Sequence, residues 1–298
     1  KNGADYVEKD LISIIIPCFN EEEMVPIFYK TMIAVMEELN QCDVELIFIN
    51  DGSTDNTLDQ MRSLAQADSR VHYLSFSRNF GKEAAMYAGL KHAKGDFVAV
   101  MDVDLQDPPN LLPTMYRTLK NSDYDCVGTK RVDRQGEPVI RSFFAKGFYK
   151  LINRISDNHI VDGARDYRLM TRQMVDAVLE LTEYNRFSKG IFTWVGFETK
   201  YIEYSNIERP AGKTSWSFWG LMKYSFDGII AFSAVPLAIA SFIGFIAFVV
   251  AVLLALFFAI RTLLFGNATS GWTSLMVMIL GMGGLQLLCL GILEKYLG

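Results

Sequence analysis

The chain has 298 residues, of which 50% are hydrophobic, and a formal net charge of −5 at pH 7. A negative net charge argues against a nucleic-acid-binding protein, because such proteins usually carry a basic surface. The four cysteines have no metal-binding spacing and are therefore expected to be reduced thiols. The hydrophobic content is enough for a sizeable core and leaves a surplus near the C-terminal end.

From the N-terminal side, strand-like apolar runs alternate with polar loops and helix-like segments. The four runs cover residues 11–16, 44–49, 71–76 and 97–101. This alternation predicts an α/β fold with a mostly parallel sheet, in which ligands bind at the carboxyl ends of the strands. Polar residues follow all four runs, so we expect them to meet at one rim. A further helix is expected at 110–119 and a strand at 125–129.

An acidic loop follows the fourth run. The loop carries Asp102, Asp104 and Gln106, and two prolines at 108 and 109 end regular structure after it. Oxygen ligands of this kind suit Mg²⁺ or Mn²⁺, which keep open positions for the phosphates of a nucleotide. An Asp-rich turn without a metal is the competing interpretation.

The loop after the second run, residues 50–55, also has two interpretations. Gly52 permits a turn, and Ser53, Thr54 or Asp55 can cap the following helix. Asp51 is not needed for the turn, and its carboxylate can accept a hydrogen bond from a base or a ribose. The chain has neither a Gly-x-Gly-x-x-Gly segment nor a Walker lysine loop, which argues against dinucleotide binding and ATP hydrolysis.

Three motifs in this order resemble those of glycosyltransferase family 2. They are Pro17-Cys18-Phe19-Asn20-Glu21, Asn50-Asp51-Gly52-Ser53-Thr54-Asp55 and Asp102-Val103-Asp104-Leu105-Gln106-Asp107-Pro108-Pro109. The resemblance implies a Rossmann-like GT-A domain. The later segments are similar to the polyprenyl-phosphate glycosyltransferases, relatives of dolichyl-phosphate mannose synthase. The Gln-x-x-Arg-Trp motif of the processive synthases is absent, which favours transfer of a single sugar.

The resemblance also implies roles for individual residues. The nucleotide sugar would be bound by Pro17, Asn20, Glu21, Asp51, Ser53, Asp102 and Lys213. The metal would be bound by Asp102, Asp104 and Gln106. The lipid phosphate would be bound by Arg131, Arg141 and Arg209. Asp166 and Arg168 would be the catalytic residues.

Asp166 and Arg168 belong to a segment, Asp162-Gly163-Ala164-Arg165-Asp166-Tyr167-Arg168-Leu169-Met170, that resembles the family's Asp-Ala-Gly-Asp-Phe-Arg-Leu. In relatives, the matching aspartate is the residue proposed to act as the base. A phosphate monoester has a second pKa of about 6 and is mostly a dianion at pH 7, so it needs little deprotonation. We therefore expect Asp166 to orient the acceptor or an arginine, and Arg168 to contact a phosphate. The alternative is an internal pair of Asp166 with Arg168.

A basic stretch with aromatic residues follows the strand at 125–129. Residues 139–155 have helical spacing of apolar side chains, and basic residues lie among them. One interpretation is an amphipathic helix at the membrane surface, and the other is a helix that packs on the sheet. At the membrane, Arg131 and Arg141 could meet a lipid phosphate, because the guanidinium fork matches phosphate oxygens.

Two long uncharged segments near the C-terminal end predict a transmembrane hairpin. They cover about 235–260 and 273–293 and are joined by a short connection that includes Arg261. We expect a catalytic domain at 1–212, an interfacial segment at 213–232 and the hairpin at 233–298. The N-terminal part has no signal-like segment, so the catalytic domain is expected on the cytoplasmic side of the inner, or plasma, membrane of the cell.

The resemblance to these glycosyltransferases, together with the two long uncharged segments, implies an inverting, metal-dependent glycosyltransferase. It would move one sugar, UDP-linked, to polyprenyl (undecaprenyl) phosphate. The expected partners are the nucleotide sugar, the lipid phosphate, the membrane, further copies of the chain up to a tetramer, and a flippase, but no nucleic acid. One alternative is transfer to a glycolipid or polysaccharide hydroxyl. Another is a catalytically silent membrane scaffold that binds a sugar nucleotide.

Overall fold

The computed structural model describes residues 9–132, 161, 163–182, 186–205, 235–266 and 271–297. The chain divides into two units, an α/β unit and a helical hairpin. The expected helix at 139–155, the expected interfacial segment at 213–232, and the residues Arg141, Arg209 and Lys213 lie outside the described residues.

The α/β unit contains a seven-stranded sheet with the strand order β3-β2-β1-β4-β6-β5-β7. Its strands are β1 (Asp10–Cys18), β2 (Cys42–Asn50), β3 (Val71–Ser75), β4 (Phe97–Val100), β5 (Cys126–Arg131), β6 (Ala164–Thr171) and β7 (Thr199–Tyr204). The first four strands pair in parallel, and β7 pairs in parallel with β5. Only β6, which is antiparallel to β4 and β5, runs the other way among these strands. The mostly parallel α/β sheet predicted from the sequence is confirmed.

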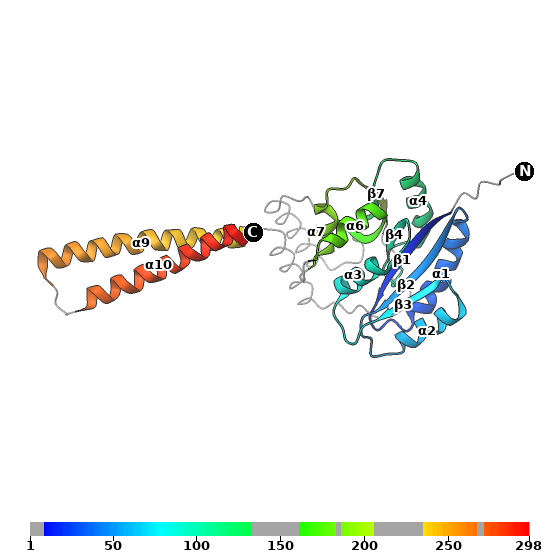
Figure 1. Cartoon of the computed structure of the whole chain (residues 1–298), viewed down its shortest axis with the longest axis horizontal. Helices are drawn as coiled ribbons and strands as arrows, with labels where there is room; N and C mark the ends of the chain where they lie inside the picture. The colour runs from blue at the N-terminus through cyan, green and yellow to red at the C-terminus, as the bar shows by residue number, and fades with distance from the viewer. Residues whose placement is uncertain are drawn as a thin grey trace, which may run out of the picture. The chain divides into compact units, whose positions relative to one another are not determined.

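Helices cover both faces of the sheet (Figure 1). They are α1 (Met24–Glu38), α2 (Thr57–Ala67), α3 (Lys82–His92), the short η1 (Pro109–Leu111), α4 (Leu112–Lys120), α6 (Arg172–Glu180) and α7 (Ser188–Trp194). Alternate residues of β1 point to opposite faces: Ile14 joins the core under α1, α2 and α4, whereas Ile15 faces α3. Gly89 makes this second contact close, because an added Cβ would lie 2.3 Å from Ile15 Cγ2.

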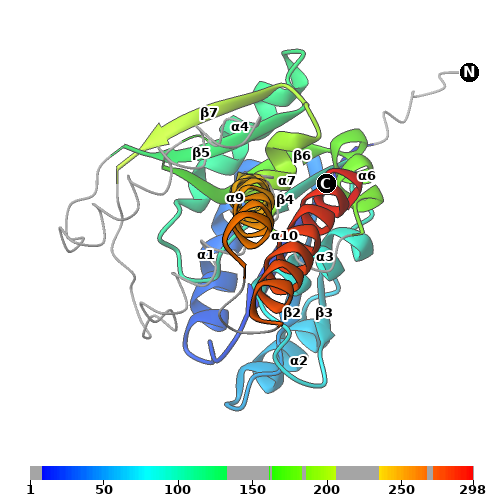
Figure 2. The same cartoon turned by 90° about the vertical axis from the view of Figure 1, so that its left-hand side faces the viewer.

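The hairpin consists of α9 (Val235–Phe265) and α10 (Trp272–Leu297), which run side by side (Figure 2). Glycines let the two helices approach, since an added Cβ at Gly284 would lie 2.8 Å from Phe248 Cα. Helix α9 extends beyond the predicted segment at about 235–260 and includes Arg261, which the sequence analysis placed in the connection. It ends where Gly266, with φ of 72°, donates its N–H to Thr262 O.

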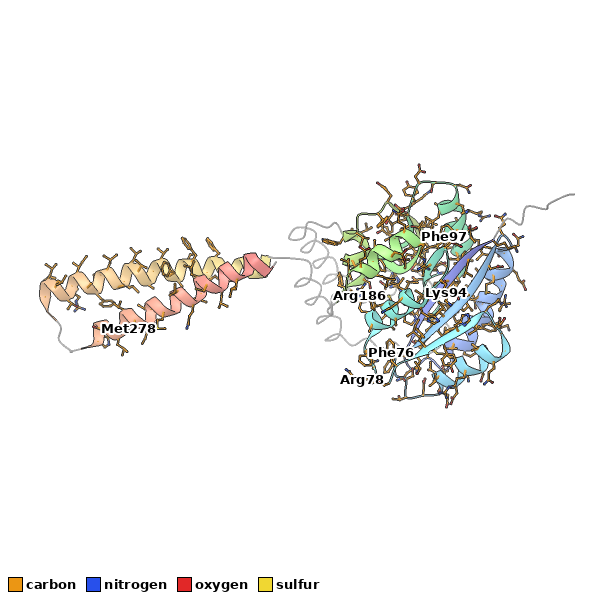
Figure 3. The ribbon with its side chains drawn as sticks, in the orientation of Figure 1. Phe76, Arg78, Lys94, Phe97, Arg186 and Met278 are labelled. Atoms are coloured by element: carbon orange, nitrogen blue, oxygen red, sulfur yellow. The ribbon has the colours of Figure 1, made fainter. Side chains whose placement is uncertain are left out.

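Large apolar side chains of the hairpin are exposed along both helices. Leu263 is 86% exposed on α9. Met278, which is labelled in Figure 3, is 69% exposed on α10. By length and composition, residues 242–265 of α9 can cross a membrane, whereas the apolar part of α10, residues 274–290, is shorter. Insertion of both helices into a bilayer stays a prediction.

Candidate active site

The ends of β1 and β2 form the first part of the predicted rim. Pro17 pairs in register with Ile49, near the end of both strands. Just beyond, Asn20 has a φ of 55°, its backbone N donates to Ser53 Oγ at 3.0 Å, and its Oδ1 accepts from Thr54 N at 2.8 Å. Asn20 and Ser53 thus tie the two strand-end loops together.

Glu21 and Asp55 continue this network. The backbone N of Glu21 donates to Thr57 Oγ1 at 2.8 Å, and Asp55 Oδ1 accepts from the backbone N of Thr57 at 3.0 Å. Asp55 therefore forms a local turn just before α2, but the N-cap of this helix is Asn56, whose side chain makes no capping hydrogen bond, so none of the three predicted residues is the cap. The network shapes the loops around which a nucleotide would bind.

Asp51 is 4% exposed and holds the loop that follows β3. Its Oδ1 accepts from Phe80 N at 2.7 Å and its Oδ2 accepts from Gly81 N at 2.9 Å. Burial raises the pKa of Asp51, and the two N–H groups oppose that rise. The held loop carries Phe76 and Arg78 (Figure 3), and Arg78 lies 4.1 Å over the ring of Phe80. Each carboxylate oxygen can accept a second hydrogen bond, so the expected nucleotide contact stays a prediction.

The acidic loop begins directly after β4, which lies next to β1 in the sheet. Leu105 adopts a φ of 57°, and Asp104 Oδ1 accepts from the backbone N of Gln106 at 3.1 Å, which closes a tight turn. Asp107, the last acid of the loop, is 1% exposed and accepts hydrogen bonds from Arg165 Nε and Tyr204 OH. Asp107 thereby anchors the acidic loop to β6 and β7.

Lys82, which the sequence analysis did not single out, joins the acidic loop to Asp166. Its Nζ lies 2.6 Å from Asp102 Oδ1 and 2.6 Å from Asp166 Oδ2. Burial alone would lower the pKa of Lys82, but the two carboxylates raise it, so the ammonium is charged. The available signal was its position: Lys82 begins α3, shortly after the polar loop expected at the end of the third strand.

Asp166 and Arg168 lie at the start of β6, next to the end of β4, where Val100 pairs in register with Arg168. Burial would raise the pKa of Asp166, but Lys82, with Lys189 and Arg168 nearby, lowers it well below its usual range. Asp166 Oδ1 is buried without a hydrogen-bond partner among the described residues. The carboxylate is therefore ionised and is a weak base.

Arg168 is 4% exposed. Its guanidinium lies 3.9 Å over the ring of Phe192, and its Nη2 donates to Arg165 O at 3.0 Å. The Nε of Arg168 donates to the backbone O of Asp166 at 3.3 Å, not to the carboxylate. This burial favours a role in positioning β6, and contact of Arg168 with a phosphate stays a prediction.

Arg131 is the one expected lipid-phosphate residue within the described ranges. It ends β5, pairs in register with Tyr204 on β7, and donates its backbone N to Gly163 O at 3.0 Å. Because Tyr204 also binds Asp107, Arg131 lies close to the anchor of the acidic loop. Its predicted site therefore adjoins the predicted metal loop.

Asp102, Asp104 and Gln106 carry oxygen atoms of the kind that hard divalent cations prefer, and a cation at the acidic loop stays a prediction. In the part of the chain that the structure describes, no three or more His, Cys, Asp or Glu side chains are grouped as a metal site. Asp102, Asp104 and the Gln106 amide would therefore supply only part of a shell, and phosphate oxygens the remainder, as is usual for Mg²⁺. Burial and the charge of Asp102 raise the pKa of Asp104. A cation bound beside Asp104 would lower this pKa, because a nearby positive charge stabilises the ionised carboxylate.

Residues 13–179 match the family model for glycosyl transferase family 2. The chain belongs to glycosyl transferase family 2. Among its family 2 relatives, a prophage bactoprenol glucosyl transferase homolog of Escherichia coli (strain K12) is 44% identical over 96% of this chain and 93% of that protein. The bactoprenol glucosyl transferase of Shigella phage SfV is 43% identical over 96% of this chain and 93% of that protein. The putative glycosyltransferase CsbB of Bacillus subtilis (strain 168) is 40% identical over 98% of this chain and 88% of that protein.

Among solved structures, a mannosyltransferase, PcManGT from Pyrobaculum calidifontis in complex with GDP-Man and Mn²⁺, aligns with 97% of this chain and 74% of its own. The TM-score is 0.49 and the sequence identity is 15%. Family 2 membership, established from sequence, confirms the expected enzyme class: the protein is a glycosyltransferase.

Proposed function

We propose that this family 2 enzyme transfers one sugar from a UDP-sugar to polyprenyl phosphate at the cytoplasmic face of the membrane. The observation that carries the proposal is the Lys82 bridge, which brings Asp166 on β6 to the acidic loop after β4. This bridge supports the proposal that the donor-side and acceptor-side residues implied by the resemblance share one site. Further support comes from the bactoprenol relatives, which match this chain over more than its α/β unit.

On the donor side, the loops after β1 and β2 would receive the nucleotide, and Asp102, Asp104 and Gln106 would hold Mg²⁺ or Mn²⁺ beside its diphosphate. When bound, the cation would neutralise the charge that develops on the departing diphosphate. The protein itself fixes the position of this loop, because Asp107 is tied to Arg165 and Tyr204.

On the acceptor side, a phosphate oxygen of the lipid would attack the anomeric carbon from the face opposite the leaving group. The new bond joins that carbon to the phosphate oxygen, the bond to the nucleoside diphosphate breaks, and the configuration inverts. A phosphate monoester, with a second pKa of about 6, is mostly a dianion at pH 7 and has no proton that must be removed. Asp166, paired with Lys82, is suited to orient such an acceptor but not to deprotonate it.

This difference also separates the phosphate acceptor from the alternative hydroxyl acceptor. Transfer to a sugar hydroxyl requires a general base in the transition state, and the base works best with a pKa near the operating pH. Asp166 has the opposite shift. Asp166→Asn is therefore expected to keep substantial activity at pH 8, whereas near-total loss at that pH would favour the hydroxyl acceptor.

The hairpin supports the membrane part of the proposal. Its exposed apolar side chains need a partner other than water, and acyl chains provide it. The proposal includes both helices as spanning segments of a protein of the inner membrane. Self-association up to a tetramer and a flippase partner stay predictions.

The test is transfer of label from a panel of nucleotide sugars to undecaprenyl phosphate, in detergent with Mg²⁺ or Mn²⁺. Organic-extractable label from one donor, which disappears in Asp104→Asn, is the expected result and identifies the sugar. Binding of a nucleotide without a lipid product from any donor would refute the proposal and favour the scaffold or hydroxyl-acceptor interpretations.

A further inference from the structure

Arg165 places a second cation against the acidic loop, at Asp107, whereas Lys82 binds Asp102. It lies on β6 directly before Asp166, and its Nε donates to Asp107 Oδ1 at 2.9 Å. The same carboxylate accepts from Tyr204 OH, so Arg165 shares its anchor with a tyrosine of β7. The Arg165 side chain is 26% exposed, whereas that of Asp107 is 1% exposed.

Only one edge of the Arg165 guanidinium is used in this anchor. Among the described residues, its two Nη atoms have no hydrogen-bond partner, and they are not among the buried polar atoms that lack one. They therefore reach accessible space. Asp102 and Asp104 influence the guanidinium electrostatically but do not bond to it.

A guanidinium held at Nε presents the remaining donors as a fixed fork. Such a fork matches the oxygens of a phosphate, and little side-chain freedom is lost when it binds, because the anchor already restricts it. The neighbourhood also needs such a group. The loop carries the carboxylates of Asp102, Asp104 and Asp107, and Lys82 joins it to the carboxylate of Asp166; these four groups would repel a phosphate that met no cation.

Arg165 also departs from the family segment given above. In Asp-Ala-Gly-Asp-Phe-Arg-Leu a glycine precedes the second aspartate, whereas Arg165 precedes Asp166 in this chain. A buried anchor, an open fork and a cation in place of a residue without a side chain occur together at this position. The arrangement therefore adds a group to the site that the motif alone does not provide.

We propose that Arg165 is a phosphate-binding residue, whose two Nη atoms take oxygens of a substrate phosphate at the acidic loop. This inference rests on the proposed function. The phosphate is either the monoester of the lipid acceptor or the diphosphate of the donor. Tyr204, which shares the Asp107 anchor, pairs in register with Arg131, the expected lipid-phosphate residue, and this neighbourhood favours the acceptor.

The test measures binding of two probes to the detergent-solubilised full chain by calorimetry. One probe is UDP with Mn²⁺, and the other is a short-chain isoprenyl phosphate, with the matching isoprenyl alcohol as its control. Arg165→Lys keeps the charge but loses the fork. This variant is expected to bind one of the two phosphate probes about 10-fold to 100-fold more weakly than the wild type does, which is the range for the loss of a hydrogen bond to a charged group. The affected probe identifies the source of the phosphate.

Tyr204→Phe is the matched control, because it removes a partner of Asp107 but no phosphate-binding group. It is expected to weaken binding of either probe less than Arg165→Lys does, because Arg165 still holds Asp107 in this variant. Equal weakening in Arg165→Lys and Tyr204→Phe would overturn the proposal, since Arg165 would then act only by holding Asp107. Unchanged binding of both probes by Arg165→Lys would overturn it as well.

The two proposals fail in different ways. If the wild type binds UDP but prefers the isoprenyl phosphate no more than the alcohol, the proposed acceptor is wrong, and the UDP measurement still decides the role of Arg165. If the wild type binds neither probe, both proposals are overturned.

Thermal melting of each variant shows whether it is folded. Arg165→Met, which removes the charge, is expected to weaken binding more than Arg165→Lys does.

Discussion

Replacement of Lys82 by Met removes the cation between Asp102 and Asp166 and keeps a side chain of similar length. Each carboxylate oxygen lies 2.6 Å from Nζ, and the three side chains are 26%, 21% and 16% exposed. At an effective dielectric constant of about 20, each attraction is roughly 6 kcal/mol, but desolvation of the three groups offsets most of it. Removal of one partner of a buried ion pair usually costs about 3–5 kcal/mol, and we expect a loss in this range at pH 7.

The loss is expected to depend on pH in a defined direction. Lys82 lowers the folded-state pKa of Asp166 below the ordinary value of 3.8. The pair therefore stabilises the folded state above that value, and its contribution is lost as the pH falls through the folded-state pKa. The difference between wild type and Lys82→Met should narrow below about pH 4.

Amide hydrogen exchange in peptides that cover β4 and β6 is the suitable assay, because the chain has two units and a single unfolding transition cannot be assumed. The double variant Lys82→Met, Asp166→Asn removes one of the uncompensated charges and should recover part of the protection. Wild-type protection of β4 and β6 in Lys82→Met, or no recovery in the double variant, would refute the reasoning.

Three further predictions concern stability. In Gly52→Ala, where φ is 65°, the added Cβ would lie 2.3 Å from the backbone of the loop after β3. In the control Gly81→Ala, φ is 95° but the added Cβ meets nothing within 4 Å. The melting temperature of Gly52→Ala should therefore be well below that of Gly81→Ala. Asp68→Asn should destabilise the chain at pH 7 and much less below about pH 4 in urea unfolding, because a hydrogen-bonded arginine lowers the folded-state pKa of Asp68, whose ordinary value is 3.8. Gly284→Leu should separate α9 from α10, because a Cβ at Gly284 would lie within 4 Å of the facing helix, whereas a Cβ at Gly283 would not. The melting temperature in detergent, followed by circular dichroism, should therefore fall more in Gly284→Leu than in Gly283→Leu.

The first four strands could be predicted because each is a short apolar run that ends at a polar loop. The structure changes their limits by one or two residues. Strand β6 could not be predicted in this way, since its central side chains include charged residues that are buried by partners distant in the sequence. Arg168, for example, is 4% exposed. Its guanidinium lies over the ring of Phe192 and donates a hydrogen bond to the carbonyl of Arg165.

The same distinction applies to the site. The acidic loop could be found from local composition, because its acids are close together in the sequence. For Lys82 the sequence offered only its position after the third strand, because its two partners are Asp102 and Asp166, and the sheet order brings those positions to one ammonium. Arg141, Arg209 and Lys213 keep their predicted roles as predictions.

The placement of β6 between β4 and β5 has a consequence for how such enzymes diversify. Because β5 and β6 are antiparallel neighbours, Lys130 and Ala164 pair in register, and the chain between them leaves and re-enters the sheet at nearly one point. The entropy of closing a loop rises by only about 0.6 kcal/mol for each doubling of its length. Evolution can therefore exchange or lengthen the segment between these two residues, while strands β1 to β4 and their register are inherited unchanged.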